Sequence, residues 1–329
     1  MNIKISNIKN ILITGISGSG GSYLAEYIIK NFKKINVHGI SRWHSTSSDK
    51  NIKDFRNKVV LHECDMLDFG SMIRTLRKSK PDIIFHLASN ANVRSSFDNP
   101  IAILNNNVSI TSNLLEGIRV LKIDPIIQIC STSEVYGQVF KNEIPIKETN
   151  PYRPVSPYAV SKTTQDLLSY AYFKSFNQKI IRTRMFAYLN PKRDDLFASS
   201  FAKQVALIEK GKLKKLKHGN LNSTRTLIDV EDAMRAYWLA AIHCDYGEDY
   251  NIGGNKIIKV GEFLKKLIKL SKTKIITEVD KNLLRPADVT LQIPDTKKFF
   301  KATKFKPKVS FSQSMRNLLE FWRVRTDKE

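Results

Sequence analysis

The glycine-rich turn at residues 15–21 constrains the fold of this chain more than any other stretch. Gly15, Gly18 and Gly21 form a G-x-x-G-x-x-G pattern that also contains Ser19 and Gly20. An apolar run typical of a buried parallel strand precedes the turn, and apolar residues at helical spacing follow it. Glycines let a backbone approach a pyrophosphate closely, and the N–H groups at a helix N-terminus attract its charge. The stretch therefore predicts a dinucleotide-binding turn between a strand and a helix.

Strand-like and helix-like segments alternate over the first half of the chain. Strands are predicted at residues 8–14, 36–40, 59–68, 81–93 and 124–137 and before residue 184, and helices at residues 71–79, 101–121 and 158–176. This alternation predicts an α/β fold with a Rossmann-type doubly wound parallel sheet and right-handed crossovers. We place this NAD(P)-binding Rossmann domain at residues 1–186. A smaller α/β C-terminal substrate domain is expected at residues 187–329, with some exchange of strands and helices between the two.

The end of the second predicted strand bears on the choice of cofactor, because ligands of such sheets bind beyond the carboxyl ends of the strands. An NAD-preferring fold places an acidic residue there, whereas this chain has Ser41 and Arg42, with Ser45 nearby. A cation and hydroxyls suit a 2′-phosphate, so we expect NADP, with NAD not excluded. The alternative is that Arg42 is a solvated turn residue. The predicted cofactor-binding residues are Gly15, Gly18, Ser19, Gly20, Gly21, Arg42, Asp65, Met66, Leu87, Ala88 and Ser89, together with Tyr158 and Lys162.

The segment from residue 130 to residue 162 carries the candidate catalytic residues. Tyr158 and Lys162 are four residues apart on a predicted helix and so lie on one face. A lysine ammonium beside a phenol lowers the phenol's pKa, which lets the tyrosine take a proton near neutral pH. Thr132, Ser133 and Glu134 add hydroxyls and a carboxylate at the end of the fifth strand. The alternative for Glu134 is a helix-start residue that satisfies backbone N–H groups.

Composition narrows the class of protein. The chain has 329 residues and a formal net charge of +23, but its lysines are scattered over helix ends and polar faces, so we expect no nucleic-acid partner. It has no apolar run long enough to span a membrane, and its three cysteines have neither disulfide-framework nor metal-site spacing. We therefore expect a cytoplasmic protein with no membrane partner and no metal. His86 is interpreted as a core residue, and Trp238, Trp322 and Phe299 are interpreted as core or lid-packing aromatics rather than as residues that stack on a substrate.

Four motifs together carry a resemblance to a known family. The glycine turn, HLAS at the fourth strand, STSEVYG at the fifth and SPYAVSK on the helix resemble the extended short-chain dehydrogenase/reductase family in its nucleotide-sugar-modifying branch. GSYLAEYI, HGISR and the triplet Thr132-Ser133-Glu134 resemble the GDP-mannose 4,6-dehydratases. FAKQVALIEKG, RTLIDVEDAMRAYWLA, the LRPADV segment and LLEFWR resemble the related GDP-4-keto-6-deoxymannose reductases. The C-terminal domain would accordingly bind a nucleotide sugar.

The resemblance to the dehydratases implies a mechanism and a role for each catalytic residue. Tyr158 would be the base on the sugar C4 hydroxyl, Thr132 would hold O4, and Lys162 would hold the nicotinamide ribose. Hydride would pass from C4 to the nicotinamide, Glu134 would remove the C5 proton, water would leave from C6, and the hydride would return to C6. A reductase needs no carboxylate at residue 134, so Glu134 favours dehydration.

The resemblance also implies residues that bind a GDP-sugar of the mannose or heptose type. Arg225, expected just before a strand, and Arg285 would match two arginines that grip the diphosphate, and guanidinium groups suit phosphate oxygens. Ala187 and Tyr188 stand in place of the usual Asn-His pair, and Phe201 in place of a lysine near the guanine. The predicted substrate-binding residues are Asn90, Asn190, Arg193, Lys203, Arg225, Arg285 and Asp288.

Three functions stay open on the sequence. The first is a GDP-mannose-type 4,6-dehydratase that serves polysaccharide biosynthesis. The second is a redox-only enzyme of the same fold, either a C4 dehydrogenase or a 4-keto reductase. The third, a non-catalytic nucleotide-binding protein, is disfavoured because nothing structural requires Thr132, Tyr158 and Lys162 together. By analogy with the family we expect a homodimer or homotetramer that pairs the helices at residues 101–121 and 158–176.

Overall fold

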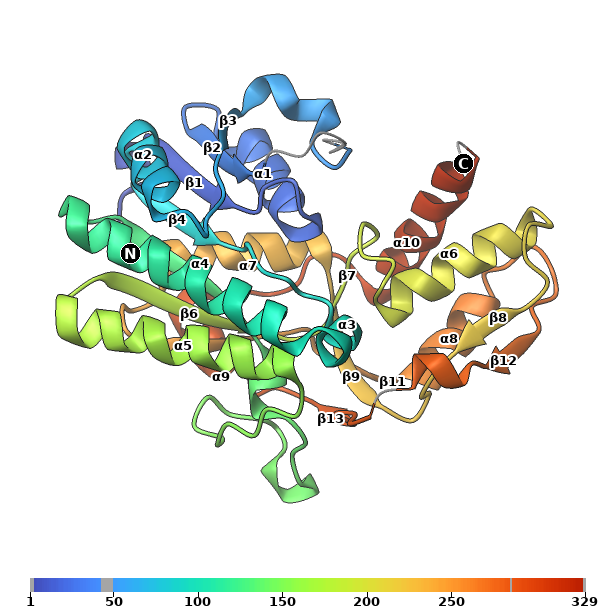
Figure 1. Cartoon of the computed structure of the whole chain (residues 1–329). Coiled ribbons are helices and arrows are strands. Elements are labelled where there is room, and N and C mark those ends of the chain that lie inside the picture. The colour runs from blue at the N-terminus through green and yellow to red at the C-terminus, as the bar shows by residue number, and fades with distance from the viewer. Residues whose placement is uncertain (1–2, 43–49, 285, 328–329) are drawn as a thin grey trace.

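The computed structural model describes residues 3–42, 50–284 and 286–327. A layered α/β body contains the first half of the chain, and a smaller lobe extends from it (Figure 1). Among the helices of these residues, none is both long and apolar enough to cross a lipid bilayer.

Seven of the described strands form one parallel sheet, in the order β3-β2-β1-β4-β5-β6-β10. The strands are β1 (Asn10–Thr14), β2 (Asn36–Ser41), β3 (Val60–Glu63), β4 (Ile83–His86), β5 (Ile126–Thr132), β6 (Lys179–Met185) and β10 (Asp249–Ile252). The direction of winding reverses between β1 and β4, so ligands are expected at the carboxyl ends of these two strands. The predicted doubly wound parallel sheet is confirmed.

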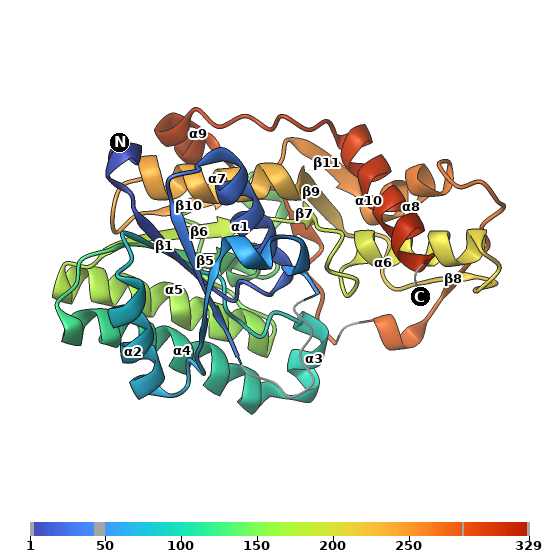
Figure 2. The same cartoon turned by 90° about the horizontal axis from the view of Figure 1, so that it is seen from above.

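Helices cover both faces of this sheet (Figure 2). They are α1 (Ser19–Asn31), α7 (Val230–His243) and α9 (Lys297–Thr303) on one face, and α2 (Phe69–Ser79), α4 (Pro100–Leu121) and α5 (Pro157–Phe176) on the other. Alternate residues of β1 serve the two cores, because side chains of a strand point to opposite faces. Ile11 and Ile13 pack with the core that includes α1 and α7, and Leu12 packs with the core of α2 and α4.

Several predicted strands are longer than the observed ones because their polar ends leave the sheet. The third strand ends at Glu63 rather than at residue 68. Beyond it the N–H group of Asp68 donates to the carbonyl of Asp65 at 3.0 Å, and the Asp68 carboxylate caps helix α2. The sequence did not predict β10, whose four residues pair with β6 only after helix α7 returns the chain to the sheet.

The smaller lobe holds a second sheet and its own core. Strand β9 (Thr224–Asp229) pairs with β7 (Tyr188–Leu189), β11 (Lys256–Lys259) and β13 (Leu291–Gln292), while β8 (Leu216–His218) pairs with β12 (Thr277–Val279). Helices α6 (Phe197–Glu209), α8 (Val260–Ile268) and α10 (Phe311–Thr326) pack around a core that includes Phe263 and Trp322. Arg225 lies inside β9, so the prediction that it precedes a strand was wrong by two residues.

Short helical turns complete the structure. They are α3 (Val93–Asp98) and the 3-10 turns Ile5–Asn7, Lys53–Lys58, Ser133–Tyr136, Lys141–Glu143 and Lys281–Leu283. The predicted core residues Trp238, Trp322 and Phe299 are all buried. His86 is buried too, and its ring nitrogens hydrogen-bond to the hydroxyls of Thr14 and Thr111, each at 2.9 Å. Its interpretation as a satisfied core residue is confirmed.

Candidate active site

A cavity of about 420 Å³ opens at the carboxyl ends of the central strands and continues between the two lobes. It is lined by residues of both lobes, from the glycine turn at one end to β9 and β13 at the other. The predicted site residues that line it are Gly15, Gly18, Ser19, Gly20, Gly21, Leu87, Ser89, Thr132, Ser133, Glu134, Tyr158, Lys162, Arg193, Arg225 and Asp288.

The glycine turn has the geometry of a phosphate cradle. Gly15 has a φ of +69°, which a side chain would strain, and a Cβ on it would lie 3.0 Å from the Cα of Ala88. A Cβ on Gly21 would lie 2.3 Å from the carbonyl oxygen of Gly15. Helix α1 starts at Ser19 with no side-chain cap, which leaves its first N–H groups for a ligand.

The end of β4 borders this cradle. The N–H group of Ala88 donates to the Thr14 hydroxyl at 3.0 Å, which fixes the chain beside Gly15. The hydroxyl of Ser89 is buried, faces the same cavity and has no hydrogen-bond partner among the described residues. A close-fitting glycine turn, a helix N-terminus and an unsatisfied hydroxyl are what a nicotinamide dinucleotide requires, so the residues present fit that cofactor.

Other predicted cofactor residues lie outside the cavity lining. Arg42 is exposed at the end of β2, beside segment 43–49, and Ser45 lies outside the described residues. The side chain of Met66 is buried in the core of α2 and α4, and Asp65 is exposed and accepts a hydrogen bond from the N–H of Leu67 at 3.0 Å. The structure thus does not bring Asp65 and Met66 to the cavity.

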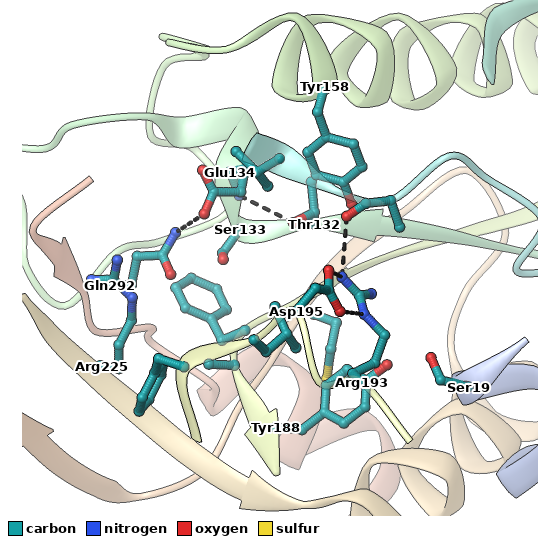
Figure 3. Close-up of a pocket in the computed structure, with 18 of the residues that line it drawn as sticks. Ser19, Thr132, Ser133, Glu134, Tyr158, Tyr188, Arg193, Asp195, Arg225 and Gln292 are labelled. Carbon is teal, nitrogen blue, oxygen red and sulfur yellow. Dashed lines mark hydrogen bonds and ion pairs between the residues drawn. The ribbon is translucent and has the colours of Figure 1, made fainter. Parts of the chain in front are cut away.

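Tyr158 and Lys162 lie on the first two turns of α5 and both line the cavity (Figure 3 shows Tyr158). The helix begins sharply because Ser156 accepts a hydrogen bond from the N–H of Ala159 at 3.1 Å and Pro157 occupies the first helical position. Only 9% of Tyr158 and 4% of Lys162 are exposed. The helix therefore presents the phenol and the ammonium in a nearly dry environment.

Burial changes the acid–base balance of this pair. It raises the pKa of Tyr158, with a further upward contribution from Cys130, while the Arg193 guanidinium opposes the rise. Burial also lowers the pKa of Lys162, and Cys130 and Asp166 act in the opposite direction. Arg193 is the cation that lowers the pKa of Tyr158 in this structure, and burial outweighs its effect. The lowering of that pKa by Lys162 stays a prediction.

The hydroxyl residues at the end of β5, Ser131, Thr132 and Ser133, have different roles in the structure. Ser131 donates to the buried carboxylate of Asp166 at 2.8 Å. Thr132 ends the strand and accepts a hydrogen bond from the N–H of Glu134 at 3.3 Å, which starts a 3-10 turn. Glu134 therefore faces the cavity from a short, capped turn, and Gln292 donates to its carboxylate at 3.2 Å (Figure 3).

The loop after β7 brings a cation to the middle of the cavity. Arg193 forms a two-pronged ion pair with Asp195, with both N–O distances at 2.7 Å, and donates to the carbonyl of Ala91 at 3.2 Å. Tyr188 lines the same region, and its hydroxyl lies close enough to Gly20 that a Cβ there would be 3.4 Å away. Figure 3 shows Arg193 and Tyr188 on one wall of the cavity and Glu134 across from them.

The far end of the cavity is polar. Arg225 donates to the carbonyls of Thr224 at 3.1 Å and Val289 at 2.5 Å, and its side chain lines the cavity. Asp288 accepts hydrogen bonds from Asn220 at 2.7 Å and Ser223 at 3.2 Å. This end thus offers both a guanidinium and a carboxylate to a polar ligand.

Three predicted substrate residues that the structure describes are not found in the cavity lining. Asn190 is buried and its side chain accepts the N–H of Lys192 at 2.9 Å, which shapes the loop. The ammonium of Lys203 donates to the carboxylate of Asp194 at 2.9 Å and lies over the ring of Trp322. Asn90 is exposed and bonds to Asn107 through its backbone. Arg285 lies outside the described residues.

Sequence reasoning missed several residues of the cavity. Gln292 lies in a segment without a motif, and Tyr237 lies in the RTLIDVEDAMRAYWLA segment but had no predicted role. The hydroxyl of Tyr237 contacts the thiol of Cys130 at 2.7 Å. Asp195 stands two residues after Arg193, and this opposite-charge spacing is the one local signal that points to it. No sequence pattern marks the others, because folding alone brings them to the cavity.

Comparison with known proteins adds the family. The family model described as GDP-mannose 4,6 dehydratase matches residues 12–318. A GDP-mannose 4,6-dehydratase of Yersinia enterocolitica is 32% identical over 268 residues, which cover 78% of this chain and 71% of the relative. A GDP-mannose 4,6 dehydratase of Cricetulus griseus is 29% identical over 342 residues, which cover 95% of this chain and 91% of the relative.

Solved structures agree on the fold. UDP-glucuronic acid 4-epimerase from Bacillus cereus, in complex with UDP-glucuronic acid and NAD, has a TM-score of 0.85 and 26% identity, and the match covers 96% of this chain and 99% of that one. RMD from Pseudomonas aeruginosa, complexed with NADPH, has a TM-score of 0.82 and 24% identity, with 96% and 100% covered. The resemblance seen in the sequence is confirmed, and a nicotinamide cofactor is supported without a choice between NADP and NAD.

Proposed function

The chain belongs to the GDP-mannose 4,6-dehydratase family, and from this we propose that it removes water from a GDP-sugar of the mannose type to give a 4-keto-6-deoxy sugar. The observation that carries the proposal is Glu134, a carboxylate that shares one cavity with Tyr158 and Thr132. A redox-only enzyme needs the phenol, the hydroxyl and the lysine but has no use for the carboxylate.

Tyr158, Thr132 and Lys162 would serve the first step, oxidation at C4. Thr132 would hold O4, and Tyr158 would take the proton of the C4 hydroxyl as the C4–H bond breaks. Lys162 would bind the nicotinamide ribose from the next turn of the helix. When bound, the nicotinamide cofactor would accept the hydride from C4 and later return it to C6, so that it ends in its original state. Hydride return to C6 would be completed by a proton at C5, and the proton that Tyr158 took from the C4 hydroxyl balances it and returns Tyr158 to its initial protonation state.

Glu134 would serve the second step, the loss of water. A C4 ketone makes the C5 proton acidic, since the electrons left behind delocalise into the carbonyl. Glu134 would take this proton, the C5–H electrons would form the C5–C6 double bond, and the C6–O bond would break. The leaving hydroxyl would take the proton from Glu134 and depart as water.

The rest of the substrate would lie toward the smaller lobe. We assign the diphosphate to Arg225 and Arg193, because guanidinium groups pair well with phosphate oxygens. Asp288 would accept hydrogen bonds from the nucleoside, and Asn90, Asn190, Lys203 and Arg285 remain predictions. Residues 1–186 would bind the cofactor and residues 187–329 the GDP-sugar.

Three further assignments belong to the same proposal. NADP is favoured over NAD because Arg42, at the end of β2, is exposed and can pair with a 2′-phosphate. A homodimer or homotetramer is favoured because α4 and α5 expose apolar side chains, among them Ile101, Val120, Leu167 and Tyr170. A cytoplasmic location is favoured by the cysteine pattern of the sequence.

A mass spectrum of GDP-mannose after incubation with the purified protein and a trace of NADP tests the function. The expected product is lighter by one water, without net reduction of the cofactor. Glu134→Gln should stop at the 4-keto sugar, and Tyr158→Phe should leave the substrate unchanged. If the protein is a redox-only enzyme, the Glu134→Gln variant should be as active as the wild type. If GDP-mannose stays unchanged, the next substrates to assay are GDP-heptoses and 4-keto sugars.

A further inference from the structure

Gln292 is the side chain that holds the carboxylate of Glu134. Its amide nitrogen donates to one carboxylate oxygen at 3.2 Å, across 158 residues of sequence (Figure 3). Only 4% of Gln292 is exposed, and its side chain lines the cavity beside Glu134. The amide is a neutral donor, so it can orient the carboxylate without neutralising its charge.

The position of Gln292 is fixed by the segment that carries it, residues 288–295, which we call the C-terminal strap. On one side the strap pairs with β9, where Gln292 stands opposite Arg225. On the other side the Thr290 N–H and hydroxyl donate to the side-chain amide oxygen of Gln138 at 2.7 Å and 3.1 Å. Beyond Gln292, two backbone hydrogen bonds of 2.7 Å join the strap to Ile146. The Ile146 N–H donates to the carbonyl of Ile293, and the Asp295 N–H donates to the carbonyl of Ile146.

These contacts tie the strap to the turn that holds Glu134. Gln138 lies two residues after the 3-10 turn at Ser133–Tyr136, so the strap is bonded to that stretch at both Glu134 and Gln138. An amide held this firmly restricts the rotation of the carboxylate it contacts. One oxygen of Glu134 is then committed to Gln292, and the other is left for the substrate.

We propose that Gln292 is a positioning residue for the C5 proton transfer, which it serves by holding Glu134 with one oxygen toward the sugar. The inference rests on the proposed dehydratase function. Gln292 acts only on the loss of water, because neither Tyr158 nor Thr132 contacts Gln292 in the described hydrogen bonds. Loss of the amide should therefore slow water loss and spare C4 oxidation.

The test compares Gln292→Met, which keeps the length of the side chain and removes the donor, with Gln292→Asn, which keeps the amide. Transient reduction of NADP reports C4 oxidation, and exchange of the C5 hydrogen in deuterium oxide reports proton removal by Glu134. We expect Gln292→Met to lower the rate of C5 exchange and kcat about 10–100-fold at an unchanged KM and rate of NADP reduction. Gln292→Asn should recover part of the loss.

Gln138→Met is the matched control, since it removes the other contact of the strap without touching Glu134. It loosens the strap but keeps the Gln292 amide, so it should change the ratio of C5 exchange to C4 oxidation far less than Gln292→Met does. Two results would overturn the inference and mean a merely structural role. One is a Gln292→Met variant that loses C4 oxidation and C5 exchange equally. The other is the same ratio of C5 exchange to C4 oxidation in Gln292→Met and Gln138→Met.

Failure of the proposed function gives a different result. If the wild type exchanges the C5 hydrogen but never loses water, the dehydratase proposal is wrong, and a slower exchange in Gln292→Met still supports the role of Gln292. If the wild type oxidises C4 without any C5 exchange, both proposals are overturned.

Discussion

The buried carboxylate of Asp166 accepts a hydrogen bond of 2.8 Å from the hydroxyl of Ser131. Asp166 follows Lys162 by one turn on α5, and Ser131 immediately precedes Thr132 on β5. This single contact therefore fixes the helix that carries the phenol and the ammonium against the strand that carries the O4 hydroxyl. The spacing of the candidate catalytic groups depends on it.

Asp166→Asn should lower the free energy of unfolding by about 3–5 kcal/mol, because it removes one partner of a buried ion-pair cluster. The carboxylate is fully buried and pairs with Arg182 at 2.8 Å and Arg184 at 3.0 Å. Urea unfolding measures the change. Ser131→Ala is the control and should cost about 1.5–3 kcal/mol, the value of one hydrogen bond to a charged group. Equal stability of Asp166→Asn and the wild type would refute the importance of the cluster.

Acid should destabilise the protein through His86. Burial, helped by the Lys162 ammonium, lowers the pKa of His86 from 6.5 to about 3. The unfolded chain therefore binds a proton below pH 6.5 that the folded chain does not, and stability falls as the pH is lowered toward 3. The slope from this group is at most about 1.4 kcal/mol per pH unit. His86→Gln should be less stable than the wild type near neutral pH, and the difference in unfolding free energy should shrink toward pH 5; a constant difference contradicts the assignment.

Gly21→Ala should weaken cofactor binding at least about tenfold, because its Cβ would force the phosphate turn open. Fluorescence titration with NADPH measures the affinity without any turnover. Gly70→Ala is the matched control at the start of α2, where the nearest atoms are 3.3 Å away and belong to side chains. Its affinity should equal that of the wild type. Wild-type affinity of Gly21→Ala would place the pyrophosphate elsewhere.

Arg42→Ala should reduce the preference for NADP over NAD by about 10–100-fold, the value of one charge-assisted pair. The quantity to measure is the ratio of the two dissociation constants. Arg77→Ala, an exposed arginine on α2, should leave the ratio unchanged. A wild type that prefers NAD, or a ratio that does not respond to Arg42, would argue against the 2′-phosphate contact.

Arg193→Gln should shift the pH dependence of kcat/KM. The part of the profile in which kcat/KM rises with pH, as Tyr158 loses its proton, should move to higher pH. The Arg193 guanidinium opposes the burial that raises the pKa of Tyr158, so its loss leaves the phenol harder to deprotonate. Asp195→Asn removes the anion that partly neutralises Arg193 and should not move this part of the profile to higher pH. A profile that stays in place in Arg193→Gln would show that Arg193 does not act on Tyr158.

The local parts of the fold and of the site could be predicted because their signals are short-range. A φ of +69° at Gly15 and a Cβ-free approach at Gly21 require glycine, and the four-residue spacing of Tyr158 and Lys162 places both on one side of α5. The sequence by itself therefore determined the doubly wound sheet, the phosphate turn and the Thr132-Tyr158-Lys162 set.

The long-range parts were decided only by the tertiary structure. Gln292 reaches Glu134 because β13 pairs with β9, and Arg193 faces Tyr158 because the loop after β7 crosses between the lobes. Met66 does not line the cavity because its side chain is buried in the apolar core beneath α2. Contacts between residues far apart in sequence depend on how separate elements pack, and no local spacing encodes that packing.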